Sequence, residues 1–418
     1  MRKVRAGARF ETRRGSQARK SSKGEAKLAK IEDSALRRDG AASAPRDARI
    51  EWLDGVRACA ATYVMLHHIY LGVFPGFPDN PGPFGLGWLM YGQLAVVIFI
   101  VVSGFSLGLA PARSGDRLKG GAAGFFRRRA WRILPPYWVA LIFSLAVAHF
   151  LLAEAPGHEV NLRSFVVHSL LVHDIVQSNT PNSAFWSIAV EAQIYLFFPL
   201  MLMLARARSP AVTAAVVLAI VCGLHGLAQT FEPLSRLDHL SLQLYACFAL
   251  GVWAVEEASS PTPRLRNWPL RWIAAAIAAA LVGLVLAFGF PWIAEHYFWI
   301  DIAVGVAVAL AFVALAEGPS RAARVLSSGP LDFVGRFSYS LYLVHVPIVA
   351  LLMFAPAVEN PFLKYAVAAG VIAPVTMAAA YLFFLAFERP FLTIRSWAAL
   401  RVWLFGGFPV LRSKNNEA

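Results

Sequence analysis

Charge is the scarcest property of this sequence. Only 15% of its 418 residues are Asp, Glu, Lys or Arg, whereas 58% are hydrophobic. So few charged side chains cannot cover the water-facing surface of a soluble domain of this length. The composition therefore excludes an ordinary soluble globular protein and favours a chain that lies mostly in a lipid bilayer.

Cysteine is also rare, and its placement excludes two common kinds of site. Cys59, Cys222 and Cys247 all lie inside apolar segments and show no CxxC or CxxH spacing. We therefore expect neither a disulfide framework nor a metal site. The simplest interpretation is that all three are small buried apolar side chains.

The charge that is present is basic, and its placement indicates its meaning. Fifteen of the 39 Lys and Arg residues fall in the first 50 positions, and most others lie in short connectors between apolar runs. Lysine and arginine accumulate in this way in segments that stay on the cytoplasmic side of a membrane. We therefore interpret the net charge of +14 as a topology signal and expect no nucleic-acid partner.

Residues 1–50 lack any apolar run and carry no aromatic residue beyond Phe10. This composition predicts a disordered basic arm in the cytoplasm. A cleavable signal peptide is not expected, because the first apolar stretch begins only at about Trp52 and would act as a signal anchor.

Ten segments are long and apolar enough to cross about 30 Å of hydrocarbon, which needs about 20 residues. They lie near 52–73, 86–110, 133–153, 184–206, 211–230, 238–257, 270–290, 298–317, 335–355 and 363–387. The shorter stretch 161–178 is interpreted as a re-entrant or interfacial helix. The prediction is an all-α, polytopic transmembrane bundle over 51–395, with a cytoplasmic tail at 396–418. A count that differs by one pair of spans remains an alternative.

Arginine is distributed unevenly between the two sides of this bundle. The predicted inner connectors are rich in it, whereas the outer loops carry only Arg163, Arg236 and Lys364 as basic residues. This asymmetry predicts an even number of spans in a bacterial inner membrane, with both termini in the cytoplasm.

Ionisable side chains inside the spans are few, and each is a candidate for function because charge in lipid is costly. Arg57 and His68 are eleven residues apart, so they lie within about 20° on one helix face and about 16 Å apart along the helix. His67 points elsewhere, and a structural role is as open for it as a functional one.

Glu191 is predicted about 10 Å below the outer boundary, at a depth similar to that of His68. A carboxylate at this level can hydrogen-bond an imidazole and fix its tautomer. We therefore expect a His68–Glu191 acid–base couple. A structural ion pair or helix-packing bond is the alternative for Glu191.

Arg129 and Arg132 are three residues apart in the predicted inner loop 111–132, at the cytoplasmic foot of the third span, and share one face if this segment is helical. Arginines with this spacing suit phosphate, although anchoring to lipid head groups is an alternative. Phosphate-binding arginines below a deep acid–base couple suit a long phosphorylated donor, such as a thioester of coenzyme A.

Six sequence blocks carry a resemblance to a known family. They are LDGVRACAATYVMLHH (53–68), FIVVSGFSLG (99–108), RRRAWRILPPYW (127–138), NSAFWSIAVEAQIYLFFPL (182–200), FSYSLYLVHVPI (337–348) and FERPFL (387–392). In this order they resemble the acyltransferase 3 family, integral-membrane enzymes that O-acylate bacterial surface glycans and related acceptors. The resemblance covers roughly residues 50–395. One departure is Glu-Ala-Gln around Glu191, where Glu-Glu-Gln is common.

The resemblance implies roles for particular residues. His68 is implied as the catalytic histidine, as general base or acyl carrier, with Glu191 and Arg57 as further catalytic candidates. The residues expected at the acyl-CoA site are Arg57, Arg129, Arg132 and Ser103. The residues expected to support the site are Trp186, Ser187, Tyr342 and His345.

The implied reaction moves an acyl group, with acetyl expected, from cytoplasmic acyl-CoA to a hydroxyl of an extracytoplasmic glycan or lipid-linked saccharide. Acyl-CoA is thus a donor substrate, and no bound cofactor is expected. A secondary transporter or glycolipid flippase is the alternative function, because it also uses intramembrane His, Glu and Arg. It predicts a duplicated sequence, and we find no paired repeat between the halves.

Overall fold

A computed structural model of the chain describes residues 50–405, apart from 81, 116, 153–160, 177, 179, 261, 266 and 354–356. The disordered arm predicted for 1–50 falls almost wholly outside the described residues, as does the tail beyond 405. We describe the unit that begins at Glu51 by itself. Every regular element in its described part is helical, as the fold-class prediction requires.

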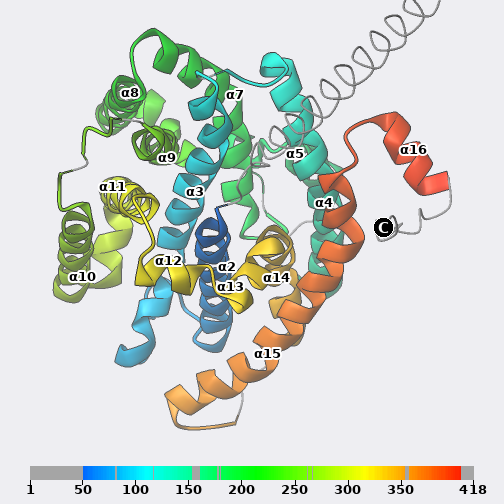
Figure 1. Ribbon diagram of the computed structural model, residues 1–418. Coiled ribbons are helices and arrows are strands. Elements are labelled where there is room, and N and C mark those ends of the chain that lie inside the picture. Colours follow the sequence, from blue (N-terminus) through cyan, green and yellow to red (C-terminus); the bar gives the residue numbers. More distant parts are fainter. Residues whose placement is uncertain are drawn as a thin grey trace, which may run out of the picture. The chain divides into compact units, whose positions relative to one another are not determined.

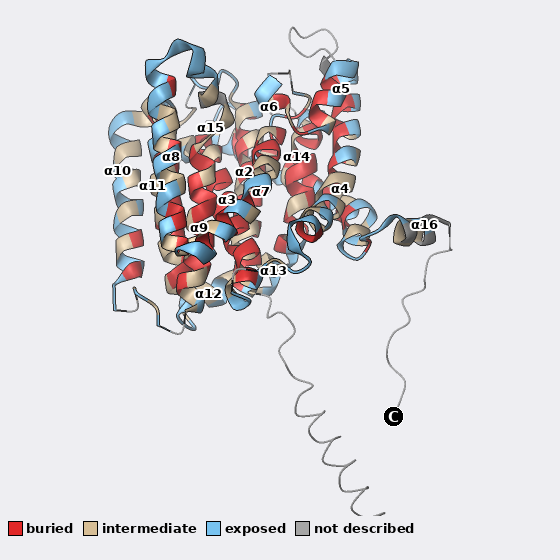
Figure 2. Ribbon diagram, turned by 90° about the horizontal axis from the view of Figure 1, so that it is seen from above, coloured by how far each residue is buried: buried red, intermediate tan, exposed pale blue. Residues whose placement is uncertain are grey.

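Ten long helices form the body of this unit, and most of them run side by side in Figure 2. They are α2 (Glu51–Val73), α3 (Gly92–Arg113), α4 (Gly121–Leu152), α7 (Phe185–Ala207), α8 (Pro210–Thr230), α9 (Gln243–Ser259), α10 (Leu270–Glu295), α11 (Tyr297–Ala316), α14 (Ser338–Leu352) and α15 (Pro361–Phe383).

Shorter helices connect or follow the long ones. They are η1 (Phe84–Met90), α5 (Leu162–Ser169), α6 (His173–Val176), η2 (Glu232–Leu240), α12 (Arg321–Leu326), α13 (Gly329–Arg336), η3 (Phe384–Glu388), η4 (Arg389–Leu392) and α16 (Trp397–Phe405). Two short helices, α5 and α6, thus lie where one re-entrant or interfacial helix was expected.

Each of the ten predicted spans overlaps one long helix, but fewer helices have the length and composition of a membrane span. Seven do so in the described part, and the pair α13–α14, bent by 70°, makes eight if it is one span. Helix α2 is less apolar because it carries Arg57, His67 and His68, and α9 has only 17 residues. The chain is therefore a helical membrane protein, and the count of ten spans stays a prediction.

Helix α4 begins at Gly121, well before the span predicted to start at 133. Arg129 and Arg132 therefore lie within a helix, not in a loop. The difference arises because hydropathy marks where a chain leaves the lipid, whereas backbone hydrogen bonds continue the helix beyond that point.

The core of the bundle lies around α2, α3 and α9. Helix α2 packs against α3, α13, α14 and α15, and α3 packs against α9 and α11 (Figure 1). Figure 2 shows outward faces of α8 and α10 that are exposed. Only 11% of the apolar stretch of α10 is buried, against 61% for α3. Exposed apolar faces of this kind suit contact with lipid.

The three cysteines differ in their surroundings. Cys247 is buried, Cys222 is partly exposed and Cys59 is exposed. The expectation of three buried side chains was therefore wrong for Cys59, because an apolar span also has a face that points away from the core.

The long helices place opposite chemistry at two ends of the bundle. We call the end where α2 begins and α3 ends the basic end, because arginines gather there; it also carries α12 and α13 (Figure 2). We call the opposite end, where α2 ends and α3 begins, the histidine end; α5 and α6 lie there. The arginines at helix ends of the basic end include Arg113, Arg206, Arg321, Arg324 and Arg336.

Candidate active site

His68 lies five residues before the end of α2 and is half-buried. Its Nδ1 lies 2.9 Å from the carbonyl oxygen of Val64 and 3.2 Å from Nε2 of His345. Its Nε2 lies 3.2 Å from Oγ of Ser183. The ring is therefore held by its own helix, by α14 and by the segment before α7.

These contacts indicate which nitrogen of His68 carries the proton. Nδ1 of His345 lies 2.8 Å from the carbonyl oxygen of Tyr342, an atom that can only accept, so neutral His345 presents a bare Nε2. Nδ1 of His68 faces that bare nitrogen and the carbonyl of Val64. A neutral His68 therefore carries its proton at Nδ1, and the lone pair of its Nε2 faces Ser183.

Asn182 positions Ser183 against His68. The Asn182 side chain is almost fully buried and donates from Nδ2 to the carbonyl oxygen of Leu343 at 3.0 Å and to Oγ of Ser144 at 3.2 Å. It thereby fastens the turn before α7 to both α14 and α4. The location of Ser183 is a consequence of this buried amide.

Three of the four predicted supporting residues meet beside this ring. Oγ of Ser187 lies 2.6 Å from the hydroxyl of Tyr342, which joins α7 to α14. The rings of Tyr342 and His345 are 5.6 Å apart. The fourth residue, Trp186, lines a cavity that is described below.

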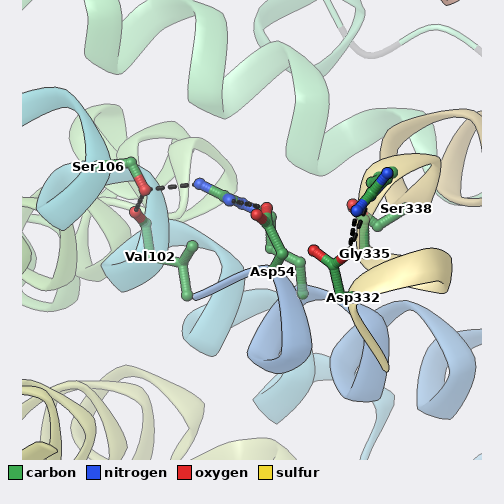
Figure 3. A network of polar contacts seen from close by, with 8 residues as sticks. Asp54, Val102, Ser106, Asp332, Gly335 and Ser338 are labelled. Carbon is green, nitrogen blue, oxygen red and sulfur yellow. Dashed lines mark hydrogen bonds and ion pairs between the residues drawn. The ribbon is translucent and has the colours of Figure 1, made fainter. Parts of the chain in front are cut away.

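Arg57 is held near the start of α2 by two side chains. Nη1 donates to Oδ1 of Asp54 at 2.7 Å, and Nη2 donates to Oγ of Ser106 at 2.5 Å. Figure 3 shows Asp54 and Ser106 in this network, with the Ser106 hydroxyl donating to the carbonyl oxygen of Val102. Arg57 thus contacts α3 near the start of α2, whereas His68 contacts α14 and the segment before α7 near the end of the same helix.

Glu191 contacts Tyr195 and not His68. Its Oε1 accepts from the hydroxyl of Tyr195 at 2.5 Å, and that hydroxyl lies 2.8 Å from Oγ of Ser103. Both ring nitrogens of His68 have other partners. The expected direct contact between His68 and Glu191 is therefore wrong, although a catalytic role for Glu191 stays a prediction.

Glu191 and His68 do lie at similar depths in the bundle, as predicted. Glu191 lies six residues into α7, about 9 Å from its start, and His68 lies about 8 Å from the end of α2. Depth alone does not tell which way a side chain points around its helix. Glu191 instead meets Tyr195, the residue one turn further along the same face.

The other predicted donor residues gather around Tyr195. The guanidinium of Arg129 lies over the Tyr195 ring, 5.9 Å from its centroid. Arg129 is close enough to Arg132, Glu191 and Arg57 to interact electrostatically with each of them. We call Arg57, Arg129, Arg132, Ser103, Glu191 and Tyr195 the arginine cluster.

The family model of the acyltransferase domain matches residues 50–389, which is most of the chain. The chain belongs to the acyltransferase 3 family. Among its relatives, YrhL of Bacillus subtilis is 28% identical over 75% of this chain and 50% of its own. The peptidoglycan O-acetyltransferase OatA of Listeria monocytogenes is 25% identical over 72% of this chain and 49% of its own.

A third relative of this acyltransferase 3 protein is the acyltransferase MdmB of Streptomyces mycarofaciens, 29% identical over 73% of this chain and 80% of its own. The chain spans about half the length of YrhL and OatA. No solved structure gives a significant match.

Two polar residues of this acyltransferase 3 chain, Glu388 and Tyr195, were not assigned a role on the basis of the sequence. Glu388 is buried, and its Oε2 accepts from the backbone N of Ser340 at 3.1 Å and from its Oγ at 2.5 Å. It thus satisfies a donor in the first turn of α14, where N–H groups lack helical partners. The sequence signal for Glu388 is its place in the block FERPFL (387–392). The signal that could have found Tyr195 is its position four residues after Glu191, one helical turn further along α7.

His67 has a structural contact in this acyltransferase 3 protein. Its Nδ1 lies 2.6 Å from the carbonyl oxygen of Leu89, which fixes η1 against α2. Its ring packs on Gly92, where an added Cβ would lie 2.5 Å from the ring. His67 therefore forms the wall between His68 and the first turn of α3.

Proposed function

We propose that this protein is a membrane O-acyltransferase that moves an acyl group, with acetyl expected, from acyl-CoA to a hydroxyl of a glycan or lipid-linked saccharide. The observation that carries the proposal is the Nε2 lone pair of His68, which faces a hydroxyl while His345 holds the other side of the ring. Family membership and the peptidoglycan O-acetyltransferase relative support this reaction class.

His68 acts as the general base in this mechanism. The acceptor hydroxyl approaches Nε2 from the side of Ser183 and gives up its proton as its oxygen attacks the thioester carbonyl. The new C–O bond forms, the C–S bond breaks, and the proton passes from Nε2 to the departing thiolate. The alternative, in which Nε2 itself carries the acyl group, uses the same lone pair.

The arginine cluster binds the phosphates of the donor. Guanidinium groups suit phosphate because their planar N–H fork matches two phosphate oxygens. Asp54 and Ser106 hold Arg57 in place, and Tyr195 lies against Arg129. Arg57 lies about 16 Å from His68 along α2, a length that the pantetheine arm of coenzyme A covers.

Glu191 orients other members of the arginine cluster through Tyr195. Its carboxylate accepts from Tyr195, so the hydroxyl of Ser103 donates to the tyrosine oxygen. This chain holds the ring that Arg129 covers. The carboxylate also offsets part of the repulsion among the three arginines.

The test is acetyl-CoA turnover by purified protein in lipid vesicles that carry no ion gradient. His68→Ala is expected to lower turnover by about 100-fold or more, the usual contribution of a general base, while insertion and folding stay normal. His149→Ala, which changes an exposed histidine of α4, is the control and should retain activity. Undiminished turnover by folded His68→Ala would refute the proposal.

The same assay separates the enzyme from a transporter or flippase. A transporter has no reason to consume acetyl-CoA, whereas an acyltransferase releases free coenzyme A. Membership of an acyltransferase family disfavours the transporter interpretation.

A further inference from the structure

A cavity of about 420 Å³ lies at the histidine end, where several helices begin or end. Its lining comes from the first turns of α3, α7, α9 and α11, from the C-terminal parts of α8 and α10, and from η2 with the two residues before α9. The residues used in the argument are Gln93, Trp186, Gln243, Tyr297 and Phe298. A volume of this size is within the usual range for sites that bind small molecules.

Two walls of the cavity adjoin the His68 site. Trp186 follows Ser183 by three residues, and Oγ of Ser183 lies 3.2 Å from Nε2 of His68. Gln93 follows Gly92, which packs directly on the ring of His67. The cavity therefore adjoins the elements that hold His68, although His68 and Ser183 are not among its lining residues.

A buried carboxylate orients two glutamines of this cavity. Nε2 of Gln93 donates to Oδ2 of Asp301 at 2.9 Å, and Nε2 of Gln243 donates to the same atom at 3.0 Å. Because a carboxylate only accepts, the amide nitrogens must face it, and the amide oxygens are left to accept from elsewhere. Asp301 is fully buried, and its Oδ1 has no hydrogen-bond partner among the described residues.

The lining suits a neutral ring with many hydroxyl groups. The rings of Trp186, Tyr297 and Phe298 line the cavity and can contact the C–H groups of a sugar, and oriented amide oxygens can accept from its hydroxyls. Lysine and arginine are absent from the lining as far as the structure describes it, whereas Glu295 is present. This charge disfavours a phosphate or carboxylate at the same place.

We propose that this cavity binds a neutral sugar ring of the acceptor next to the elements that hold His68. Gln93 and Gln243 determine specificity for hydroxyl groups, and Asp301 is the residue that positions both. The proposal rests on the proposed function only in naming this sugar as the acyl acceptor. Binding of the sugar is a separate property that can be measured without turnover.

The experiment measures protection of a cysteine at the rim of the cavity. Leu237→Cys, a lining position that leaves Glu295 in place, is labelled with a maleimide in the full-length protein in vesicles, and labelling is compared with that of the parent chain. Chitotriose, a neutral oligosaccharide, is expected to slow labelling severalfold, whereas glucose 6-phosphate at the same concentration is not. Equal effects of the two sugars, or no effect of either, would overturn the proposal.

Further variants in the Leu237→Cys background locate the site. Trp186→Ala is expected to raise the chitotriose concentration needed for protection by about tenfold, the effect of losing one aromatic contact. Trp272→Ala changes an exposed tryptophan of α10 at the basic end and should leave protection unchanged. Gln93→Ala is expected to act like Trp186→Ala. Gln93→Ala also removes a hydrogen-bond donor from the buried Asp301, which can prevent folding. If Gln93→Ala does not fold, Trp186→Ala alone tests the site.

His68→Ala separates the two proposals. If both hold, it abolishes acetyl-CoA turnover and leaves protection by chitotriose intact. Protection that is present while His68→Ala still turns over acetyl-CoA would refute the mechanism but not the cavity assignment. Protection that survives Trp186→Ala unchanged would refute the cavity assignment alone.

Discussion

At the scale of single residues, the protonation of His68 depends on a side chain 277 positions away in the sequence. Nδ1 of His345 is committed to backbone carbonyls, so its Nε2 can only accept from a neutral His68. The result is an orienting contact of the kind that fixes the tautomer of a catalytic imidazole. His345 is a positioning residue in this account, because it reaches the reaction only through His68.

Replacing His345 with alanine should lower kcat by about tenfold to 100-fold, because a misplaced base transfers its proton poorly. The KM for acetyl-CoA should change little, since the arginine cluster is untouched. His345→Gln can place an acceptor oxygen near His68 and should recover part of kcat. Steady-state kinetics in vesicles measure this split; a raised KM at constant kcat would contradict the positioning role.

At the scale of elements, glycine decides how closely α3 and α9 approach. A Cβ on Gly104 would lie 2.2 Å from the carbonyl oxygen of Phe248, and a Cβ on Gly251 would lie 2.3 Å from that of Val101. Small residues of this kind let membrane helices pack backbone against backbone. The Ser-Gly-Phe block therefore combines a packing residue, Gly104, with a polar one, Ser103.

Gly104→Ala should destabilise the protein by about 1–3 kcal/mol, the usual cost of overpacking a close contact. The midpoint of thermal unfolding in detergent measures the effect. Gly283→Ala is the matched control, because an added Cβ there meets nothing within 4 Å on α10. Equal midpoints for the two variants would show that the helices can separate at little cost.

The bend between α13 and α14 also has a consequence at this scale. The two helices meet at 70°, which leaves the first turn of α14 without a continuous helix before it. Backbone N–H groups of that turn therefore need an acceptor from outside the helix, and Glu388 accepts from the N–H and the hydroxyl of Ser340. Arg132 of the arginine cluster lies close enough to interact with Glu388 electrostatically. The block FERPFL (387–392) thus places a carboxylate near the arginine cluster.

At the scale of the whole molecule, the basic and histidine ends predict a fixed orientation in the membrane. The positive-inside rule predicts that the basic end faces the cytoplasm. We then expect acyl-CoA to enter at that end, and the proposed sugar cavity to open to the other side.

Cysteine labelling in intact cells measures that orientation. Ser235→Cys, in η2 at the histidine end, should react with a membrane-impermeant maleimide from outside. Arg324→Cys, in α12 at the basic end, should react only after the membrane is permeabilised. The reverse pattern would place the arginine cluster outside the cell and would contradict entry of acyl-CoA from the cytoplasm.

The sequence by itself determined the helical membrane fold, the family and most candidate residues. These properties follow from local patterns: apolar runs of sufficient length, six blocks in order, and rare ionisable residues inside the spans. It also predicted that Arg57, Arg129, Arg132 and Ser103 belong to one site; the structure brings them together around Tyr195, and their role in binding acyl-CoA stays a prediction. Ser187, Tyr342 and His345 likewise lie together.

Only the tertiary structure decided the partners. Hydropathy reports how deep a residue lies, but it does not report which way the side chain points or which helix is its neighbour. Glu191 and His68 have similar depths, yet Glu191 binds Tyr195 and His68 meets His345 and Ser183. Asp301 joins Gln93 and Gln243 for the same reason, since three helices from distant parts of the chain meet at that point.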